Sequence, residues 1–241
     1  FSEFLNINNM QVFIFVLAGS LRLFLFRLYH LGNDDYVLAK KNIMFDDVFN
    51  AAFVCSLVAL LFSRIFFVFM NPEPVFLSPL GFLLFPYFPG LSLTGGLIGG
   101  ILALFFYCGR KKIPRARVFD FFSISFIFAL PFGFIGYFLL SQDITAGNVV
   151  KFILYALILA ATNIYLYPKA SALEIKDGTT SALFLVFFAL TSLLAGAIDH
   201  PGTTYFISHR ENYILLLILF FSIVIILKQE ILGRMVIKNG K

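Results

Sequence analysis

Val48–Met70 reads VFNAAFVCSLVALLFSRIFFVFM, a run of 23 residues in which Arg64 is the sole charged side chain. A helix of about 20 mostly apolar residues is long enough to cross the hydrocarbon core of a bilayer. Asn50, Ser56 and Ser63 are the other clearly polar residues of the run. The segment therefore predicts a membrane-spanning helix, and it sets the class of the whole chain.

The composition of the 241 residues agrees with that assignment. Hydrophobic residues make up 60% of the chain, 34 residues are Phe, and only 13% are charged, against about 25% in soluble domains. So little polar surface excludes a soluble enzyme, a nucleic-acid-binding protein and a disordered chain. The net charge of +5 is better explained by basic loops on one side of a membrane than by a nucleic-acid partner.

Six further apolar runs, separated by Pro, Gly or charged residues, are long enough to be considered as spans. They are Gln11–Tyr29, Leu93–Tyr107, Phe119–Leu140, Val149–Tyr167, Thr180–Ile198 and Tyr213–Leu227. Leu93–Tyr107, the third span along the chain, is short for a span unless its ends extend. The sequence thus predicts an all-α, polytopic membrane protein of seven transmembrane helices, forming a single domain over residues 1–241.

The basic residues predict how these helices are oriented. Loops on one side hold 14 Lys and Arg residues and loops on the other hold two, Lys151 and Arg210. Positive charge accumulates in cytoplasmic loops, so we expect the N-terminus outside and the C-terminus in the cytoplasm. The 14 residues are Arg27, Lys40, Lys41, Arg110, Lys111, Lys112, Arg115, Arg117, Lys169, Lys176, Lys228, Arg234, Lys238 and Lys241.

Arg64 and the connection that follows its helix are unusual. A guanidinium at this depth suits a ligand for a lipid phosphate, and the alternatives are snorkelling to the headgroups or pairing with a structural carboxylate. The connection, residues 71–92, lacks Lys and Arg and carries five prolines. We expect it to lie at the outer interface or to dip back against the bundle, with a merely long loop as the alternative.

Two sets of glycines predict close helix packing. Gly95 and Gly99, like Gly96 and Gly100, stand four residues apart, a spacing that lets helix backbones approach. Their N–H groups at a helix start also suit an anionic headgroup, although spacing alone favours packing. Pro131, Gly133 and Gly136 predict a kink or a tight crossing in the fourth span.

The remaining polar residues suggest structural roles. We expect Asp120 to pair with the basic cluster at 110–117. Asp199, His200, His209 and Arg210 read as an ordinary solvated loop rather than as an acid–base or metal group. Cys55 and Cys108 read as buried apolar residues. No catalytic motif, metal-ligand spacing or cofactor motif stands out, so we expect no cofactor and no metal.

Several of these residues resemble one family, the bacterial prolipoprotein diacylglyceryl transferases. Leu93-Thr94-Gly95-Gly96-Leu97-Ile98-Gly99 resembles its His-Gly-Gly-Leu-Ile-Gly motif, and Asp120 lies 26 residues after Thr94, where the family has a similar Asp. Weaker similarities are Ser63–Val68 to a Gly-Arg-x-Gly-Tyr-Val element, Gly133–Phe138 to a Gly-Arg-x-Gly-Asn-Phe signature, and Gly178–Leu185 with Pro201 to the sixth helix and its loop.

The resemblance implies seven helices with an outside N-terminus, and transfer of the diacylglyceryl group of phosphatidylglycerol to a lipoprotein cysteine. It breaks at the polar residues that such chemistry needs. Thr94 occupies the position of the motif His. Phe134 and Tyr137 occupy the positions of the signature Arg and Asn. Other polar residues of the family are replaced at Leu140, Gln142, Ser192 and Gly196. The family's His-Pro-Ser-Gln-Leu-Tyr-Glu element survives only as Leu154-Tyr155.

These losses favour a protein that keeps the fold without catalytic residues. Such a protein would bind phospholipid, phosphatidylglycerol among the candidates, or dock other subunits in the bacterial inner membrane. The alternatives are a divergent active transferase that uses Arg64 with His200, His209 or Asp199, and a small transporter. The residues expected to line a lipid site are Arg64, Thr94, Gly95, Gly96, Gly133, Gly136 and Tyr137.

Overall fold

The computed structural model describes residues 7–33, 35–41, 43–78, 81–82, 90–140 and 144–232, and within these ranges every regular element is helical. Seven helices are long and apolar enough to cross a membrane, as the sequence predicts. They are α1 (Ile7–Asn33), α3 (Phe45–Met70), α5 (Leu93–Lys111), α6 (Arg115–Leu140), α7 (Ala146–Ala161, continued by η2, Thr162–Leu166, and α8, Tyr167–Ser171), α9 (Thr179–Asp199) and α11 (Arg210–Ile226, continued by η3, Leu227–Leu232). Short elements are α2 (Tyr36–Lys40), η1 (Pro74–Leu77) and α10 (Thr203–Ser208).

The third span is longer than the apolar run suggested. Ser92 begins α5 by accepting a hydrogen bond from the Gly95 N–H at 3.1 Å. The helix continues to Lys111 and stops where Lys112 takes a left-handed conformation, with φ of 56°. The last turn of the helix is therefore basic. Arg110 and Lys111 stabilise this helix C-terminus electrostatically, and their long side chains can reach water or lipid headgroups.

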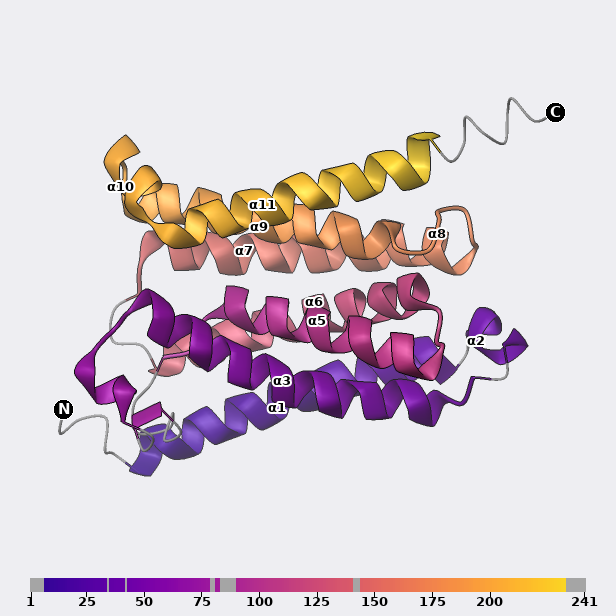
Figure 1. The fold of residues 1–241 in the computed structure, drawn as a ribbon, viewed down its shortest axis with the longest axis horizontal. Helices are drawn as coiled ribbons and strands as arrows, with labels where there is room; N and C mark the ends of the chain where they lie inside the picture. Colours follow the sequence, from indigo (N-terminus) through magenta and orange to yellow (C-terminus); the bar gives the residue numbers. More distant parts are fainter. Residues whose placement is uncertain are drawn as a thin grey trace.

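The seven helices form two groups joined by α6. Figure 1 shows α1, α3, α5 and α6 on one side of the molecule and α7, α9 and α11 on the other. Helix α6 packs against α1 within its own group and against α7 and α9 of the second group. A hydrophobic cluster of the first group and a second one around α6, α7 and α9 fill these contacts.

Gly95 and Gly99 allow a close helix approach, as their spacing predicts, whereas a Cβ at Gly96 or Gly100 would have its nearest atom at an ordinary 3.5 or 3.8 Å. A Cβ added to Gly95 would lie 2.3 Å from Phe66 Cβ of α3, and one added to Gly99 would lie 2.4 Å from Phe62 Cβ. A Cβ on Gly136 would meet Val16 of α1 at 2.1 Å. Helix α6 runs as one helix through Pro131, and the predicted tight crossing is present.

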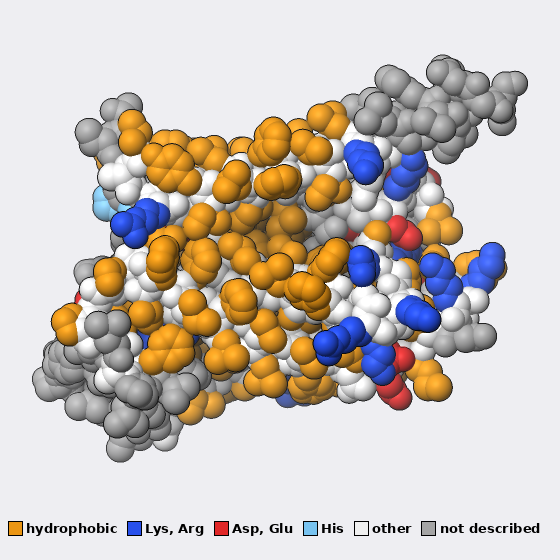
Figure 2. Space-filling model, in the orientation of Figure 1, with side chains coloured by type: hydrophobic (Ala, Val, Ile, Leu, Met, Phe, Trp, Pro, Cys, Tyr) orange, Lys and Arg blue, Asp and Glu red, His pale blue; other side chains and the backbone are white. Residues whose placement is uncertain are grey.

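Most of the basic side chains lie at one end of the molecule, where Figure 2 shows the blue groups gathered. We call this the basic end; it holds α2, α8, the end of α5 and the start of α6. The far end, which begins α5, α7 and α11, is called the opposite end. Cys55 and Cys108 are free and buried in the first group's core, as expected.

The prediction that Asp120 pairs with the basic cluster is wrong. Asp120 is 2% exposed, and its two carboxylate oxygens accept hydrogen bonds from the backbone N–H groups of Gly178 and Ser181, each at 2.7 Å. It therefore caps the start of α9, whose first N–H groups have no partner within the helix. The cluster's buried cation, Arg117, instead binds Asp35 at 2.6 Å and Asp177 at 3.1 Å.

Candidate functional site

Arg64 is held by backbone carbonyls at the opposite end. It is 2% exposed, and three of its N–H groups donate to Phe82 O at 3.0 Å, Gly90 O at 2.9 Å and Gly81 O at 2.7 Å. Snorkelling and pairing with a carboxylate are therefore both wrong. These bonds use three of the five donors of a guanidinium, and the role of Arg64 as a phosphate ligand stays a prediction.

The carbonyls that bind Arg64 belong to the proline-containing connection after α3. Phe76 is 8% exposed, and its ring lies 5.7 Å from that of Phe67, between centroids. Ser92 N donates to Ser63 O at 3.1 Å. The described part of the connection thus folds back onto α3, in agreement with the prediction that it dips against the bundle; Pro79, Pro86 and Pro89 lie outside the described residues.

Thr94, at the position of the motif His, connects the two helix groups. Its hydroxyl donates to Glu211 Oε1 at 2.5 Å, so the start of α5 is tied to the start of α11. Thr94 is 2% exposed and Glu211 is partly buried. Sequence reasoning missed Glu211, although an acidic residue in the first turn of an otherwise apolar span is a usable signal.

Asp199 and Lys151 lie close to this connection. Asp199 accepts hydrogen bonds from the Thr145 hydroxyl at 2.9 Å and from Gly147 N at 2.7 Å, so it holds the start of α7 against the end of α9. Lys151 stands one helical turn after Gly147 on the same face of α7, and Gly147 packs against Asp199. We call Thr94, Lys151, Asp199 and Glu211 the Lys151 cluster.

The solvated loop expected around Asp199 is partly correct. His200, His209 and Arg210 are exposed, as a solvated loop requires. Asp199 is partly buried and joins α9 to α7, so the expectation is wrong for that residue. Within the described residues no group of three or more His, Cys, Asp or Glu side chains is arranged to hold a metal.

An aromatic column fills the core below the Lys151 cluster. Phe134, at the position of the signature Arg, packs on Tyr155 with ring centroids 5.6 Å apart, and Tyr155 stacks on Phe188 at 6.3 Å. Phe184 and Phe126 continue the column, with centroid distances of 6.0 and 5.8 Å. Tyr155 and Phe188 are each 1% exposed, so aromatic rings fill this space.

The other predicted lipid-site residues make structural contacts of their own. The N–H groups of Gly95 and Gly96 donate to the side chain and the carbonyl of Ser92, so they cap α5. Gly133 and Gly136 face α1. Tyr137 is 40% exposed and accepts a hydrogen bond from Asn148 at 3.0 Å. Gln142 lies outside the described residues.

A hollow runs between α5 and α11 on the face shown in Figure 2, and hydrophobic side chains line it. Leu97 of α5 and Leu215 of α11 contribute to the cluster of apolar residues around α6, α7 and α9. These residues lie one helical turn beyond Thr94 and Glu211. Thr94 and Glu211 therefore lie at the starts of the two helices that border the hollow.

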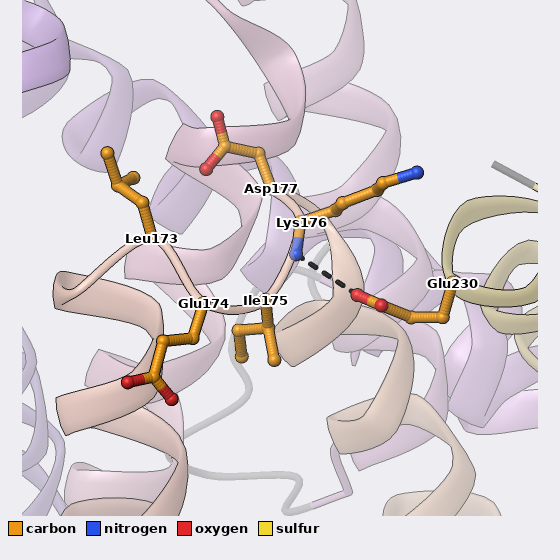
Figure 3. Close-up of a pocket in the computed structure, with 6 residues that line it drawn as sticks. All are labelled: Leu173, Glu174, Ile175, Lys176, Asp177 and Glu230. Atoms are coloured by element: carbon orange, nitrogen blue, oxygen red, sulfur yellow. Dashed lines mark hydrogen bonds between the residues drawn. The ribbon is translucent and has the colours of Figure 1, made fainter. Parts of the chain in front are cut away.

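A pocket of about 480 Å³ opens at the basic end, between the loop after α8 and η3. Figure 3 shows Glu174 and Lys176 pointing away from each other, with the backbone N–H of Lys176 donating to Glu230 at 3.0 Å. One of its charged residues, Asp177, already binds Arg117. This pocket lies at the other end from the positions that resemble the transferase motif, and we assign it no role in the site.

Comparison with known families gives one match that spans the chain. The family model for prolipoprotein diacylglyceryl transferase matches residues 12–235. Comparison with curated proteins gives no match. The matched range begins in the first span and ends beyond the seventh, so it includes all seven.

Proposed function

The chain belongs to the prolipoprotein diacylglyceryl transferase family, and we propose that it is a non-catalytic member that binds phospholipid. The family moves the diacylglyceryl group of phosphatidylglycerol to the thiol of a lipoprotein cysteine. We place this multi-pass protein in the bacterial cytoplasmic membrane, with its basic end in the cytoplasm because positive charge accumulates there. Docking to other membrane subunits is the second role that such a scaffold would serve.

The aromatic column is the observation that carries the loss of catalysis. Phe134 stands where the resemblance places an Arg, and it is packed between Tyr155 and Tyr137 rings. A transferase must stabilise the negative charge that develops on its departing phosphate group, and such stabilisation is usually the largest catalytic term. A phenyl ring supplies no N–H donor and no charge.

Thr94 supports the same conclusion at the position of the motif His. Its hydroxyl donates to Glu211, and an alcohol is too weak a base to take up a proton near neutral pH as an imidazole does. Both positions have therefore lost the groups that proton transfer and charge stabilisation need. The helix packing that the glycines set is retained.

The alternative is a divergent active transferase, and Lys151 favours it. This cation stands on α7 one helical turn after the glycine that packs against Asp199, and it offers a positive charge at the opposite end. The residues first considered for such a mechanism support it less, because Arg64 binds three carbonyls and Asp199 caps α7. An active enzyme would thus have to work with Lys151 in place of the family's charged residues.

A transfer assay separates the two proposals. The purified protein is reconstituted with phosphatidylglycerol that carries a labelled diacylglyceryl group, and a lipobox peptide is added as acceptor. We expect no labelled peptide, while a family member with an intact His and Arg serves as the positive control. Labelled peptide above the level of empty vesicles would show that the protein is an enzyme.

A further inference from the structure

Arg115 is an exposed cation whose side chain packs in a defined place at the basic end. It is the first residue of α6, and its guanidinium carbon lies 4.2 Å from the centroid of the Phe105 ring on α5. Gly109 of α5 makes room for it, because a Cβ added there would lie 2.5 Å from Arg115 Nη2. The guanidinium is therefore held against the surface of α5, over a ring and beside a position that has no side chain.

This packing leaves the hydrogen-bond donors of Arg115 available. An arginine side chain stacks on an aromatic ring through its planar face and donates hydrogen bonds through its edge. The contact with Phe105 uses the face, and within the described part of the chain no hydrogen bond or ion pair uses the N–H groups. Arg115 is thus oriented and keeps the paired donors with which a guanidinium binds a phosphate.

An exposed apolar stripe on α5 leads to Arg115. Leu102, Phe105 and Phe106 are 40%, 44% and 66% exposed, and together with Gly109 they have the i, i+3, i+4, i+7 spacing of one helix face. The stripe from Leu102 to Gly109 is about 10 Å long at 1.5 Å per residue. Since α5 is long and apolar enough to cross a membrane, acyl chains lie against such exposed side chains. A chain that follows the stripe ends at the guanidinium.

The charges beside Arg115 favour an anionic lipid over a zwitterionic one. Arg110 and Lys112 are exposed at the end of α5, and like Arg115 they form no ion pair among the described residues. Asp47 of the neighbouring α3 is already paired with Lys111 at 3.1 Å. A zwitterionic headgroup would bring its ammonium close to three cations, whereas an anionic headgroup brings only negative charge.

We propose that Arg115 binds the phosphate of an anionic phospholipid whose acyl chain lies along Leu102, Phe105 and Phe106. Basic groups at the end of a membrane span are suited to anionic headgroups of the adjoining leaflet, and here the guanidinium is also placed at the end of an apolar surface. The site lies at the other end of α5 from Thr94. The inference therefore goes beyond the proposed function and does not depend on it.

The test is lipid binding to the full-length, delipidated protein in detergent, measured by native mass spectrometry. The probes are phosphatidylglycerol and phosphatidylcholine with identical acyl chains. We expect the wild type to prefer phosphatidylglycerol, and Arg115→Gln to weaken phosphatidylglycerol about fivefold, the contribution of one basic residue to binding an anionic lipid. Binding of phosphatidylcholine should change little. Glycerol phosphate, which has the headgroup phosphate without acyl chains, should not compete at the concentration of the lipid.

Gly109→Ala moves the guanidinium without changing the charge of the protein. The added methyl group takes the place of Arg115 Nη2, the flexible end of a side chain, so the fold is retained. Binding of phosphatidylglycerol should fall about threefold, the effect of losing roughly one hydrogen bond. Gly100→Ala, on the same helix with its nearest atom 3.8 Å away, and Lys169→Gln, an exposed cation elsewhere at the basic end, are the matched controls and should leave binding unchanged.

Three results would overturn the inference. The first is equal binding of the two lipids by the wild type, or unchanged phosphatidylglycerol binding in Arg115→Gln. The second is a loss in Lys169→Gln as large as in Arg115→Gln with none in Gly109→Ala, which would show a diffuse attraction by the basic end. The third is competition by glycerol phosphate, which would show a site for a soluble anion. The transfer assay tests the proposed function separately, and none of these results decides its outcome.

Discussion

Asp120→Ala is the substitution that most strongly tests how the two helix groups are joined. Asp120 is 2% exposed on α6 and accepts two backbone hydrogen bonds of 2.7 Å from the start of α9. A hydrogen bond to a charged group contributes about 1.5–3 kcal/mol. Losing two of them in a buried setting should lower the free energy of unfolding by about 3–5 kcal/mol. Asp120→Asn keeps one good acceptor, so we expect about half of that loss.

The assay is equilibrium unfolding in mixed micelles, followed by circular dichroism while the denaturing detergent is increased. Asp47→Ala is the control, because Asp47 forms an exposed ion pair with Lys111 at 3.1 Å and such pairs contribute about 0–1 kcal/mol. Raising the salt concentration should change the control pair and leave the Asp120 effect in place. A loss as small as the control's, or one that salt removes, would show that Asp120 acts through the basic cluster and not as a cap.

Three further substitutions test other contacts. Asp35→Asn leaves the buried Arg117, whose Nη2 lies 2.6 Å from Asp35 Oδ2, without its closest anion; we expect about 3–5 kcal/mol of destabilisation, and a melting temperature equal to that of the wild type would contradict this. Gly136→Ala places a methyl group against α1 and should cost about 1–3 kcal/mol, whereas Gly133→Ala, with its nearest atom 3.8 Å away, should be close to neutral in the same melting experiment. Arg64→Met removes three bonds to the connection after α3, so hydrogen exchange there should become faster while the α9 amides keep their protection; unchanged exchange would show that the arginine does not hold it.

The helices were predictable because their signal is local and strong. A run such as Val48–Met70 needs no tertiary information to be read as a span. The Gly95/Gly99 spacing likewise predicts a close approach, and the structure shows Phe62 and Phe66 of α3 as the partners. Even here, the partner helix could not be named from the sequence alone.

The polar contacts were not predictable because their partners are distant in sequence. Asp120 lies near the basic cluster along the chain, yet its partners Gly178 and Ser181 lie 58 and 61 residues away. Thr94 and Glu211 are separated by 117 residues. Pairing by proximity in sequence favoured the wrong partner for Asp120 and offered none for Thr94.

The carbonyl partners of Arg64 were not predictable for a different reason. The sequence suggests charged or headgroup partners for a cation in a span, because side chains and lipids are what sequence patterns describe. Its real partners are the carbonyls of Gly81, Phe82 and Gly90, which any residue type would supply. An irregular segment at membrane depth must have its backbone satisfied by protein, and that requirement is the signal that could have identified Arg64 as its anchor.

The most direct test of the account is transfer of a labelled diacylglyceryl group from phosphatidylglycerol to a lipobox peptide by the purified, reconstituted protein. The wild type should give no product, and restoring Thr94→His alone should give none either, because Phe134 and the aromatic column still fill the position of the signature Arg. Product formed by the wild type at a rate that Lys151→Met abolishes would contradict the loss of catalysis and identify a divergent enzyme.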